Sequence, residues 1–457
     1  MASNLTTHLD KGELQEDLTF GYWRRSRGAK RVTAVLAELN LPQEGDRILH
    51  GNVEFTGQYV RRVLAEAPAG CGIALLHSHL GPGWQGMSDD DEVAERDRLS
   101  SAAAGRTRLP LLGLTRGTDG SWSGRLWLRE RPFTYVRRWA DTVRVVGERV
   151  KITHLPTEVI AGPTPLQEAT ISVWGRRAQR EMVRARIGIV GLGSVGSICA
   201  EALARVGFER ITLIDHDLLE DRNLDRTLGA ARSDIGRSKV RVAARNVRRS
   251  HTAADFSVRV VEKSLLTKSG LAEALDCDVL LSCVDRPWPR FLLNTIAYSH
   301  LVPVVDGGIL ARVKPDGTPL HVTWRIHTVG PSRGCLVCIG ALRMSDVALD
   351  MDGKLDDPDY LQGLSEDERA MVSRRNVFPF SLSVGAHQVL QLVTLLTDMP
   401  RIGGSGQQRY HAYPGTMSVA QMICEADCPF TSITALATDL VPDLHPELEV
   451  PVDGANS

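Results

Sequence analysis

The chain has 457 residues and a formal net charge of −1, and 24% of its residues are charged. This length exceeds one ordinary hydrophobic core and predicts two or three domains, while the balanced charge gives no electrostatic reason to expect nucleic-acid binding. No apolar stretch approaches the roughly 20 residues that span a bilayer, and the polar N-terminus has no secretory signal. We therefore expect a cytoplasmic protein with no membrane or nucleic-acid partner, whose eight cysteines are mostly reduced.

Hydrophobic periodicity divides the chain into two α/β domains. Residues 1–155 alternate strand-like and helix-like segments and predict one compact domain. Residues 156–170 contain three prolines and predict a linker. Residues 171–435 follow a regular β-α-β order, which predicts a Rossmann-like, doubly wound fold with a mainly parallel sheet. Residues 436–457 are acidic and proline-rich and predict a loose tail.

The first domain contains the stretch HSHLGPGWQGMSDDD at residues 77–91. His77 and His79 are two residues apart, so on a strand they project from one face. Two imidazoles and a carboxylate from the following loop would give zinc three protein ligands and leave a fourth position open for water. A histidine pair in a loop is more often structural, but the Ser88-x-x-Asp91 pattern that follows favours a metal site.

The order H-x-H, loop, S-x-x-D resembles the zinc isopeptidase signature of the JAB/MPN (JAMM) family, whose members cleave ubiquitin-like proteins from their attachments. The resemblance implies His77, His79 and Asp91 as zinc ligands, with Ser88 as the oxyanion donor. The loop between the second histidine and the serine is one residue longer than the family usually has. Asp90 therefore stays open as an alternative ligand.

The same resemblance implies an upstream glutamate as general base. In that family the glutamate begins a strand some tens of residues before the histidines. Glu16 precedes a strand-like run and is our choice, whereas Glu13 and Glu38 are weaker candidates.

The second domain opens with a glycine-rich turn. Gly191, Gly193 and Gly196 form G-x-G-x-x-G between a predicted strand and a predicted helix, where the backbone can approach a phosphate. Asp215 ends the next strand, where a carboxylate accepts hydrogen bonds from ribose hydroxyls. Up to this point an NAD-dependent oxidoreductase with an N-terminal binding domain fits equally well.

The stretch DHDLLEDRNLDRTLGAARSDIGRSKV and the strand LLSCVDRPWPR resemble the ThiF/MoeB/ubiquitin-activating enzyme superfamily. That resemblance implies an enzyme that uses ATP and Mg²⁺ to adenylate the C-terminal carboxylate of a ubiquitin-like protein. Arg226 and Lys239 would neutralise charge on the phosphates, and Asp285 would hold Mg²⁺. Asp215 would bind the ribose, and Asn223 would orient the ribose or phosphates.

The match to that superfamily has departures. An Arg-Gln dipeptide that reaches a dimer neighbour's ATP is missing before the glycine-rich strand, where Arg176, Arg177 or Arg180 are the possible substitutes. Relatives that form a thioester carry Arg-Asn-Cys where this chain has Arg375, Asn376 and Val377. We therefore expect adenylation without a thioester at that position, with a conjugating enzyme or another thiol taking the adenylate. One of the lone cysteines (Cys71, Cys199, Cys277 or Cys283) is the less favoured alternative.

Four cysteines are paired along the sequence. Cys335 and Cys338 form C-x-x-C, and Cys424 and Cys428 form C-x-x-x-C. The superfamily commonly carries a closed, structural Cys₄ zinc site at these places. Disulfides are the rival interpretation, which a reducing cytoplasm disfavours.

Together the two resemblances imply a bifunctional enzyme of a bacterial ubiquitin-like conjugation system. One half would process or deconjugate a ubiquitin-like protein with a small C-terminal residue, and the other would activate its carboxylate. Homodimerisation follows from resemblance alone. The NAD-dependent oxidoreductase and a non-catalytic adaptor that keeps both folds remain the alternatives.

Overall fold

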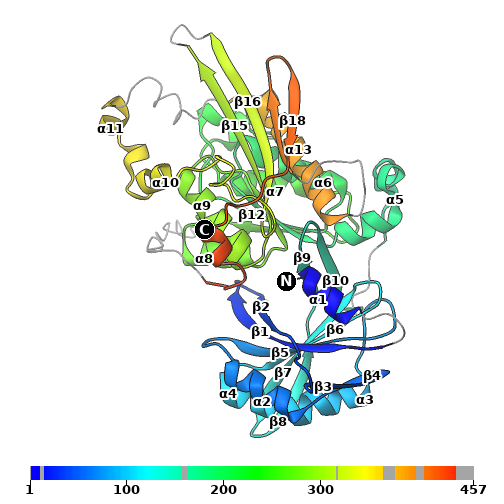
Figure 1. The fold of residues 1–457 in the computed structure, drawn as a ribbon. Helices are drawn as coiled ribbons and strands as arrows, with labels where there is room; N and C mark the ends of the chain where they lie inside the picture. Colours follow the sequence, from blue (N-terminus) through cyan, green and yellow to red (C-terminus); the bar gives the residue numbers. More distant parts are fainter. Residues whose placement is uncertain are drawn as a thin grey trace, which may run out of the picture.

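Two large sheets organise the described part of the chain (Figure 1), one of six strands and one of eight. The N-terminal sheet lies in the lower half of Figure 1 and the C-terminal sheet in the upper half. The computed structural model describes residues 2–10, 15–156, 162–314, 318–363, 376–397 and 406–438.

The N-terminal sheet has the order β2-β1-β5-β6-β7-β8. Only β5 and β6 pair in parallel, and the other neighbours are antiparallel. Every residue of β5 is buried, as expected of a strand covered on both faces. The strands are β1 (Leu18–Arg27), β2 (Val32–Asn40), β5 (Gly72–Ser78), β6 (Leu111–Arg116), β7 (Trp122–Arg131) and β8 (Thr134–Trp139).

Helices cover both faces of this sheet. Ile73 and Leu75 of β5 pack in one apolar cluster with α2 (Gly57–Glu66) and α4 (Ser100–Thr107). Ala74 and Leu76 pack in another with α1 (Ala2–Leu9). Between β5 and α4 the chain forms α3 (Asp89–Glu92) and a π-helix (Val93–Leu99). A small hairpin of β3 (Arg47–His50) and β4 (Asn52–Phe55) forms a separate two-stranded sheet that contacts β1. Side chains alternate between the two faces of a strand, so the odd-numbered residues that follow Leu75 point to the same face as Leu75. The helix layer on that face includes α3.

The C-terminal sheet has the order β13-β12-β11-β14-β15-β16-β17-β18. The pairs from β13 to β15 are parallel, and those from β15 to β18 are antiparallel. The prediction of a mainly parallel sheet therefore holds only for the strands from β13 to β15. Strand β16 is antiparallel to β15 because the connection between them is too short for a crossover. The strands are β11 (Arg186–Val190), β12 (Arg210–Ile214), β13 (Ser257–Val261), β14 (Val279–Ser282), β15 (Val304–Val313), β16 (Pro319–Val329), β17 (Gln407–His411) and β18 (Thr416–Ala420).

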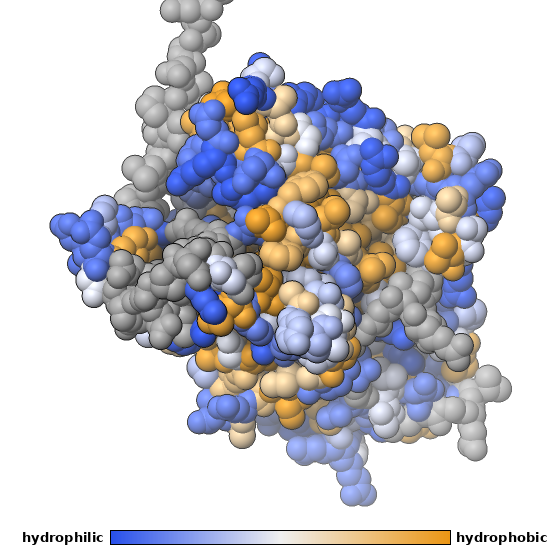
Figure 2. Space-filling view, turned by 90° about the horizontal axis from the view of Figure 1, so that it is seen from above, coloured by the Kyte–Doolittle hydropathy of each residue, from blue (hydrophilic) through white to orange (hydrophobic). Residues whose placement is uncertain are grey.

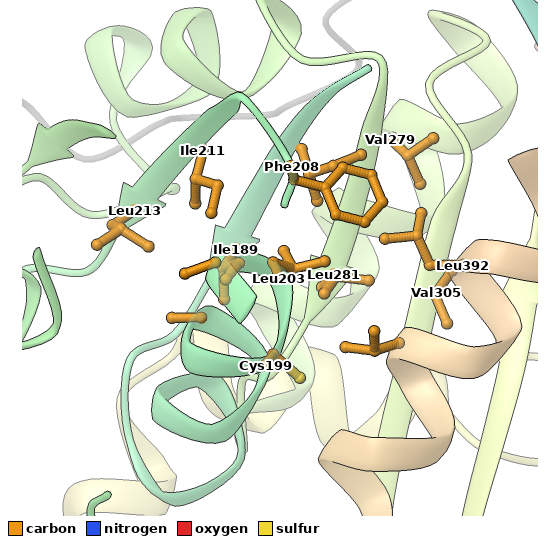
Figure 3. Packing of buried hydrophobic residues seen from close by; sticks show 14 of the residues in the cluster. Ile189, Cys199, Leu203, Phe208, Ile211, Leu213, Val279, Leu281, Val305 and Leu392 are labelled. Carbon is orange, nitrogen blue, oxygen red and sulfur yellow. The ribbon is translucent and has the colours of Figure 1, made fainter. Parts of the chain in front are cut away.

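Two apolar clusters hold helices to the two faces of this sheet. Figure 3 shows part of the first, where Cys199 and Leu203 of α6 and Leu392 of α13 pack on strand residues such as Ile189 and Leu281. The second cluster joins α8 and α9 to the opposite face and continues to the paired cysteines. The helices are α5 (Glu168–Met182), α6 (Ser194–Val206), α7 (Lys239–Ser250), α8 (Lys268–Leu275), α9 (Pro287–Ser299), α10 (Met344–Met351), α11 (Pro358–Gly363), α13 (Phe378–Leu396) and α14 (Pro429–Ser432).

Helix α13 is apolar and long enough to cross a bilayer by length and composition alone, contrary to the expectation that no stretch approaches that length. However, 56% of its apolar window is buried inside the protein, against β15, β16 and α6. This is the environment of a core helix.

Outer strands of the C-terminal sheet expose apolar side chains. Leu320 of β16 and Val419 of β18 are 62% and 59% exposed. Figure 2 views the molecule from above, and hydrophobic residues gather near the centre of that face between hydrophilic ones. At the C-terminal end, Thr438 is held by a hydrogen bond from its N–H to Ser299 Oγ at 2.8 Å. The rest of the predicted tail lies outside the described residues.

The two domains are joined through a buried carboxylate. Asp278, just before β14, is 1% exposed and accepts hydrogen bonds at 3.1 Å from both Arg31 and Arg144 of the N-terminal domain. It also accepts the backbone N–H of Arg186, the first residue of β11, at 3.0 Å. Burial alone would raise the pKa of Asp278, but Arg144 and Arg31 hold it below its ordinary value. The N-terminal domain thus docks at the amino edge of the parallel strands.

Further contacts extend this interface. Ser26 of β1 hydrogen-bonds with His300, after α9, at 2.8 Å. Arg333 donates to the carbonyl of Gly147 at 2.8 Å, in the turn between β9 (Thr142–Val146) and β10 (Val150–His154). Residues of this hairpin belong to one apolar cluster in the N-terminal domain and to one in the C-terminal domain, so the hairpin packs on both domains.

Replacing Asp278 by asparagine should destabilise the folded protein by up to about 3 kcal/mol, because it leaves two partly buried guanidinium groups without a carboxylate. Urea unfolding followed by tryptophan fluorescence measures the change. Because the pKa of Asp278 is lower in the folded state, its stabilisation is present above the unfolded-state pKa and is lost as pH falls through the folded-state pKa. Glu181→Gln, which breaks an exposed ion pair with Arg177, is the control and should change nothing measurable. An unchanged midpoint for Asp278→Asn would contradict the role of Asp278 as an anchor.

Candidate active sites

Three side chains predicted as metal ligands converge at the carboxyl end of β5. His77 Nε2 and His79 Nε2 are 3.1 Å apart. Asp91 Oδ1 lies 3.3 Å from His77 Nε2, and Asp91 Oδ2 lies 3.2 Å from His79 Nε2. Ligand atoms at 2.0–2.1 Å from a tetrahedral zinc ion would be about 3.3 Å apart. The donor set and its spacing therefore fit zinc.

Asp91 reaches the histidines because a capping box begins helix α3. The Ser88 hydroxyl accepts the N–H of Asp91 at 3.1 Å, and the Asp91 carboxylate accepts the N–H of Ser88 at 2.9 Å. This reciprocal pair fixes the carboxylate over the first turn and leaves the Ser88 hydroxyl proton to be donated elsewhere. Asp90 is exposed and is not part of the group of converging donors.

Strand pairing brings Glu16 to the same place. Strands β1 and β5 pair in antiparallel register as far as His77. Beyond it, Ser78 N–H donates to the Asp17 carbonyl and Asp17 N–H donates to Ser78 Oγ, each at 3.0 Å. This continuation sets Glu16 opposite His79, and opposite residues of an antiparallel pair share a face. Of the weaker candidates, Glu38 pairs with Tyr22 farther along β1, and Glu13 lies outside the described residues.

The electrostatics of these groups reflect their proximity. Burial raises the pKa of Glu16, against the opposing effect of His79 and His77. Burial would also raise the pKa of Asp91, but its hydrogen bonds with His77 and His79 hold it well below the ordinary value. The hydrogen bond to Asp91 raises the pKa of His79. These are four interacting groups rather than separate surface residues.

The glycine-rich turn in the second domain adopts a conformation that requires glycine at two positions. Gly191 follows β11 with φ +88°, and an added Cβ would lie 2.7 Å from the Cys283 carbonyl oxygen. A Cβ on Gly196 would lie 1.8 Å from the carbonyl oxygen of Gly191. Gly193, before α6, has φ −75° and open space around its Cα. The turn therefore brings the start of α6 close to the carboxyl end of β11, as phosphate-binding turns do.

Asp215 and Lys239 lie beside this turn. The Asp215 carboxylate accepts the N–H of Leu192 at 2.6 Å and that of Asp217 at 2.8 Å, so it braces the glycine-rich turn. Burial raises the pKa of Asp215. Lys239 Nζ donates to Asp217 Oδ2 at 2.7 Å, and its side chain is 12% exposed. An ammonium group is thus held at the carboxyl edge of the sheet.

The other predicted nucleotide residues lie on segments that follow the strands. Asn223 Oδ1 accepts the N–H of Glu220 at 3.0 Å, and Arg226 donates to the carbonyl of Arg222 at 2.7 Å, so both hold their own loop. Asp285 is exposed in the segment after β14. Arg176, Arg177 and Arg180 are exposed on α5.

One residue near the glycine-rich turn was missed as a contact by sequence reasoning. Asn376 Nδ2 donates to Ser194 Oγ, in the first turn of α6, at 2.9 Å and to Ser381 Oγ at 2.7 Å. Asn376 thus joins α13 to the turn. Arg375 lies outside the described residues. No local sequence signal predicts a contact between residues so far apart.

The paired cysteines form a single cluster. Their four sulfur atoms all lie within 4.8 Å of one another, and Cys335 Sγ is 3.6 Å from Cys428 Sγ. A disulfide requires about 2.05 Å, so the rival disulfide interpretation is wrong for the described cysteines, which are all free thiols. Sulfur atoms at 2.3 Å from a tetrahedral zinc would be about 3.8 Å apart. The backbone N–H of Cys335 points at Cys424 Sγ at 3.2 Å, which suits a thiolate ligand, and the cluster fits a closed zinc site.

The C-terminal domain matches the model of the ThiF family over residues 166–428. Because this match covers more than half of the chain, the protein belongs to the ThiF family. The match starts after the N-terminal domain and includes the glycine-rich turn, Lys239 and the cysteine cluster.

Curated relatives are similar over part of the same region. The tRNA threonylcarbamoyladenosine dehydratase of Escherichia coli (strain K12) is 31% identical over 163 residues, which cover 35% of this chain and 59% of that protein. The SAMP-activating enzyme E1 of Haloferax volcanii is 32% identical over 150 residues, covering 31% and 54%. This chain thus spans less than two thirds of the length of these relatives. A crystal structure of E. coli MccB with ATP superposes with a TM-score of 0.44 at 16% identity, covering 58% of this chain and 74% of that one.

The glycine-rich turn allows a matched pair of substitutions. Gly196→Ala should destabilise the C-terminal domain by about 1–3 kcal/mol or more, because the new methyl group meets a backbone carbonyl that cannot move aside. Gly193→Ala meets nothing and should leave nucleotide-free stability nearly unchanged. Thermal unfolding of the two variants without nucleotide compares them. Equal melting temperatures would contradict the close approach of α6 to Gly191.

Proposed function

We propose that the protein is a bifunctional enzyme of ubiquitin-like protein metabolism. Its C-terminal domain would adenylate the C-terminal carboxylate of a ubiquitin-like protein with ATP and Mg²⁺. Its N-terminal domain would be a JAB/MPN-like zinc isopeptidase that processes or deconjugates such a protein. The observation that carries the first activity is the ThiF family match around a phosphate-binding turn. The convergence of His77, His79 and Asp91 carries the second.

In the adenylation reaction the carboxylate attacks the α-phosphate of ATP and pyrophosphate leaves. The glycine-rich turn and the N-terminus of α6 would hold phosphates. Lys239 and Arg226 would neutralise the charge that builds on them, and Asp285 would hold Mg²⁺. Asp215 would bind the ribose, and Asn223 would orient the nucleotide. Family membership favours ATP over the NAD of an oxidoreductase.

The partner of this reaction is proposed to be a ubiquitin-like protein that ends in a small residue. Two of the relatives support this class of partner: one is a ubiquitin-like modifier-activating enzyme and the other is a SAMP-activating enzyme. Homodimerisation and transfer of the adenylate to a conjugating enzyme are part of the same proposal.

The N-terminal reaction would be metal-assisted hydrolysis. Zinc bound by His77, His79 and Asp91 would supply a Lewis acid and acidify a water at its open position. Glu16, opposite His79, would take the proton of the attacking water and pass it to the leaving amine. Ser88 would donate its hydroxyl proton to the developing oxyanion. A second, structural zinc would be held by the four cysteines.

Adenylation is tested by ATP–pyrophosphate exchange in the presence of a panel of ubiquitin-like proteins. Exchange should depend on one of them, and Lys239→Met or Asp285→Asn should lower it by about 10²–10³-fold because charge stabilisation is lost. Lys151→Met, an exposed lysine of the N-terminal domain, is the matched control and should keep full exchange. Undiminished exchange in both site variants would show the nucleotide site to be misassigned, and calorimetry with ATP–Mg²⁺ against NAD separates the two cofactor classes.

The isopeptidase site is tested by metal content and by cleavage of the same proteins carrying a C-terminal extension. The wild-type protein should hold one zinc at each site, His77→Ala should lose the N-terminal zinc and cleavage, and Cys424→Ser should lose the other zinc. Glu16→Gln should keep both metals but lose cleavage, because it removes a base and no ligand. Full cleavage by His77→Ala with its fold intact would refute this half of the proposal.

A further inference from the structure

A buried ion pair lies beneath the metal-ligand triangle of the N-terminal domain. The side chains of Glu95 and Arg125 are both 0% exposed. Arg125 Nε donates to Glu95 Oε2 at 2.9 Å, and Arg125 Nη2 donates to Glu95 Oε1. Trp127 Nε1 adds a third donor to Glu95 Oε2 at 2.6 Å. Both oxygens of the buried carboxylate therefore accept hydrogen bonds.

The space for this pair exists because Gly113 of β6 lacks a side chain. A Cβ there would lie 2.4 Å from Glu95 Oε2 and 2.7 Å from Arg125 Nε. The strand, the π-helix and the ion pair are therefore packed tightly against one another. Any shift of the helix along the sheet would separate the charges.

Arg125 connects the ion pair to the first histidine. Arg125 Nη1 donates to Thr115 Oγ1 at 2.6 Å, and Thr115 Oγ1 lies 3.3 Å from His77 Nε2. Thr115 of β6 is the register partner of His77 in the parallel β5–β6 pair. Because zinc would occupy the lone pair of His77 Nε2, Thr115 cannot also hydrogen-bond that nitrogen, and its contact with the ring is one of packing.

Glu95 connects the ion pair to the carboxylate ligand. It follows Asp91 by four residues in one continuous helical segment, α3 and the π-helix, so the two side chains lie on the same side of the helix. A π-turn is rare and frequently occurs at functional sites. The strand β5 supplies the histidines and the helix supplies Asp91, and the ion pair joins these two elements across β6 and β7.

We propose that Glu95 and Arg125 are positioning residues of the N-terminal metal site. The Glu95–Arg125 pair sets where the helix presents Asp91 to the histidines. The proposal rests on the proposed zinc site and adds the residues that keep its ligands in place. Stability alone does not explain such a pair, since apolar residues often replace a buried ion pair without loss.

The experiment measures zinc affinity by competition with a chromophoric chelator, and the ligand geometry by the visible spectrum of the Co²⁺-loaded protein. The double variant Glu95→Gln/Arg125→Met removes both charges but keeps an acceptor for Trp127. Arg125→Lys keeps the positive charge but loses the two-point contact with Glu95, and it keeps the test valid if the double variant does not fold. Thermal unfolding of each variant checks the fold, and the cysteine-bound zinc is the internal control.

Both variants should bind zinc at the N-terminal site about 10–100-fold more weakly, the effect expected when a partner that orients a ligand is lost. The Co²⁺ spectrum should change in intensity, while the cysteine-bound metal should not. Arg96→Met breaks an exposed ion pair on the same π-helix and should have no effect.

Two failures are distinguishable. If the wild-type protein binds zinc at both sites and the folded variants bind it with unchanged affinity and spectrum, the positioning role is wrong. If the wild-type protein and His77→Ala both hold only the cysteine-bound zinc, the metal site itself is wrong, and the positioning role falls with it.

Discussion

Backbone polar groups in a strand that is buried on both faces must be paired within the sheet, and both candidate sites depend on this constraint. In such strands, β5 and β14 for example, every residue is buried and most side chains are apolar. The groups proposed to bind metal or nucleotide gather where these strands end. His77 and His79 occur at the carboxyl end of β5, and Gly191 follows the carboxyl end of β11. The chemistry of each domain therefore begins at a strand end fixed by a rigid core.

Buried carboxylates then decide how these elements are held together. Asp278 binds two arginines of the other domain and so fixes the two domains to each other. Glu95 binds Arg125 inside the N-terminal domain and joins the helix layer to the sheet. In both cases a charge is buried with full hydrogen bonding, and removal of one partner would leave the other uncompensated.

The domain interface and the nucleotide turn lie on opposite edges of the C-terminal sheet. Asp278 and Arg186 mark the amino ends of β14 and β11, whereas Gly191 and Asp285 follow their carboxyl ends. The docking of the N-terminal domain consequently leaves the carboxyl edge of the sheet uncovered by that interface. A nucleotide and a protein tail would approach from that edge.

Local sequence determined where the strands and turns of this protein lie and which chemical groups they carry. Short stretches of sequence predict the order of the buried strands, the glycine-rich turn and the spacing of the histidines and Ser88. These features depend on the period of side chains along an element and on backbone sterics. The same holds for the choice of Glu16, whose place before a strand set it opposite His79. The antiparallel half of the large sheet could have been inferred from the short turn after β15, but the repeated β-α-β pattern favoured a parallel sheet.

Only the tertiary structure decided the contacts between distant segments. Nothing local marks Arg125 as the partner of Glu95, or Asn376 as the partner of Ser194, because each pair is brought together by packing of separate elements. The choice of Asp91 over Asp90 likewise depends on how the capping box turns the first residues of α3 toward β5. The sequence determined which chemical groups are present and at which strand ends they occur. The fold decided which of them meet, because distances between helices and strands depend on the whole core.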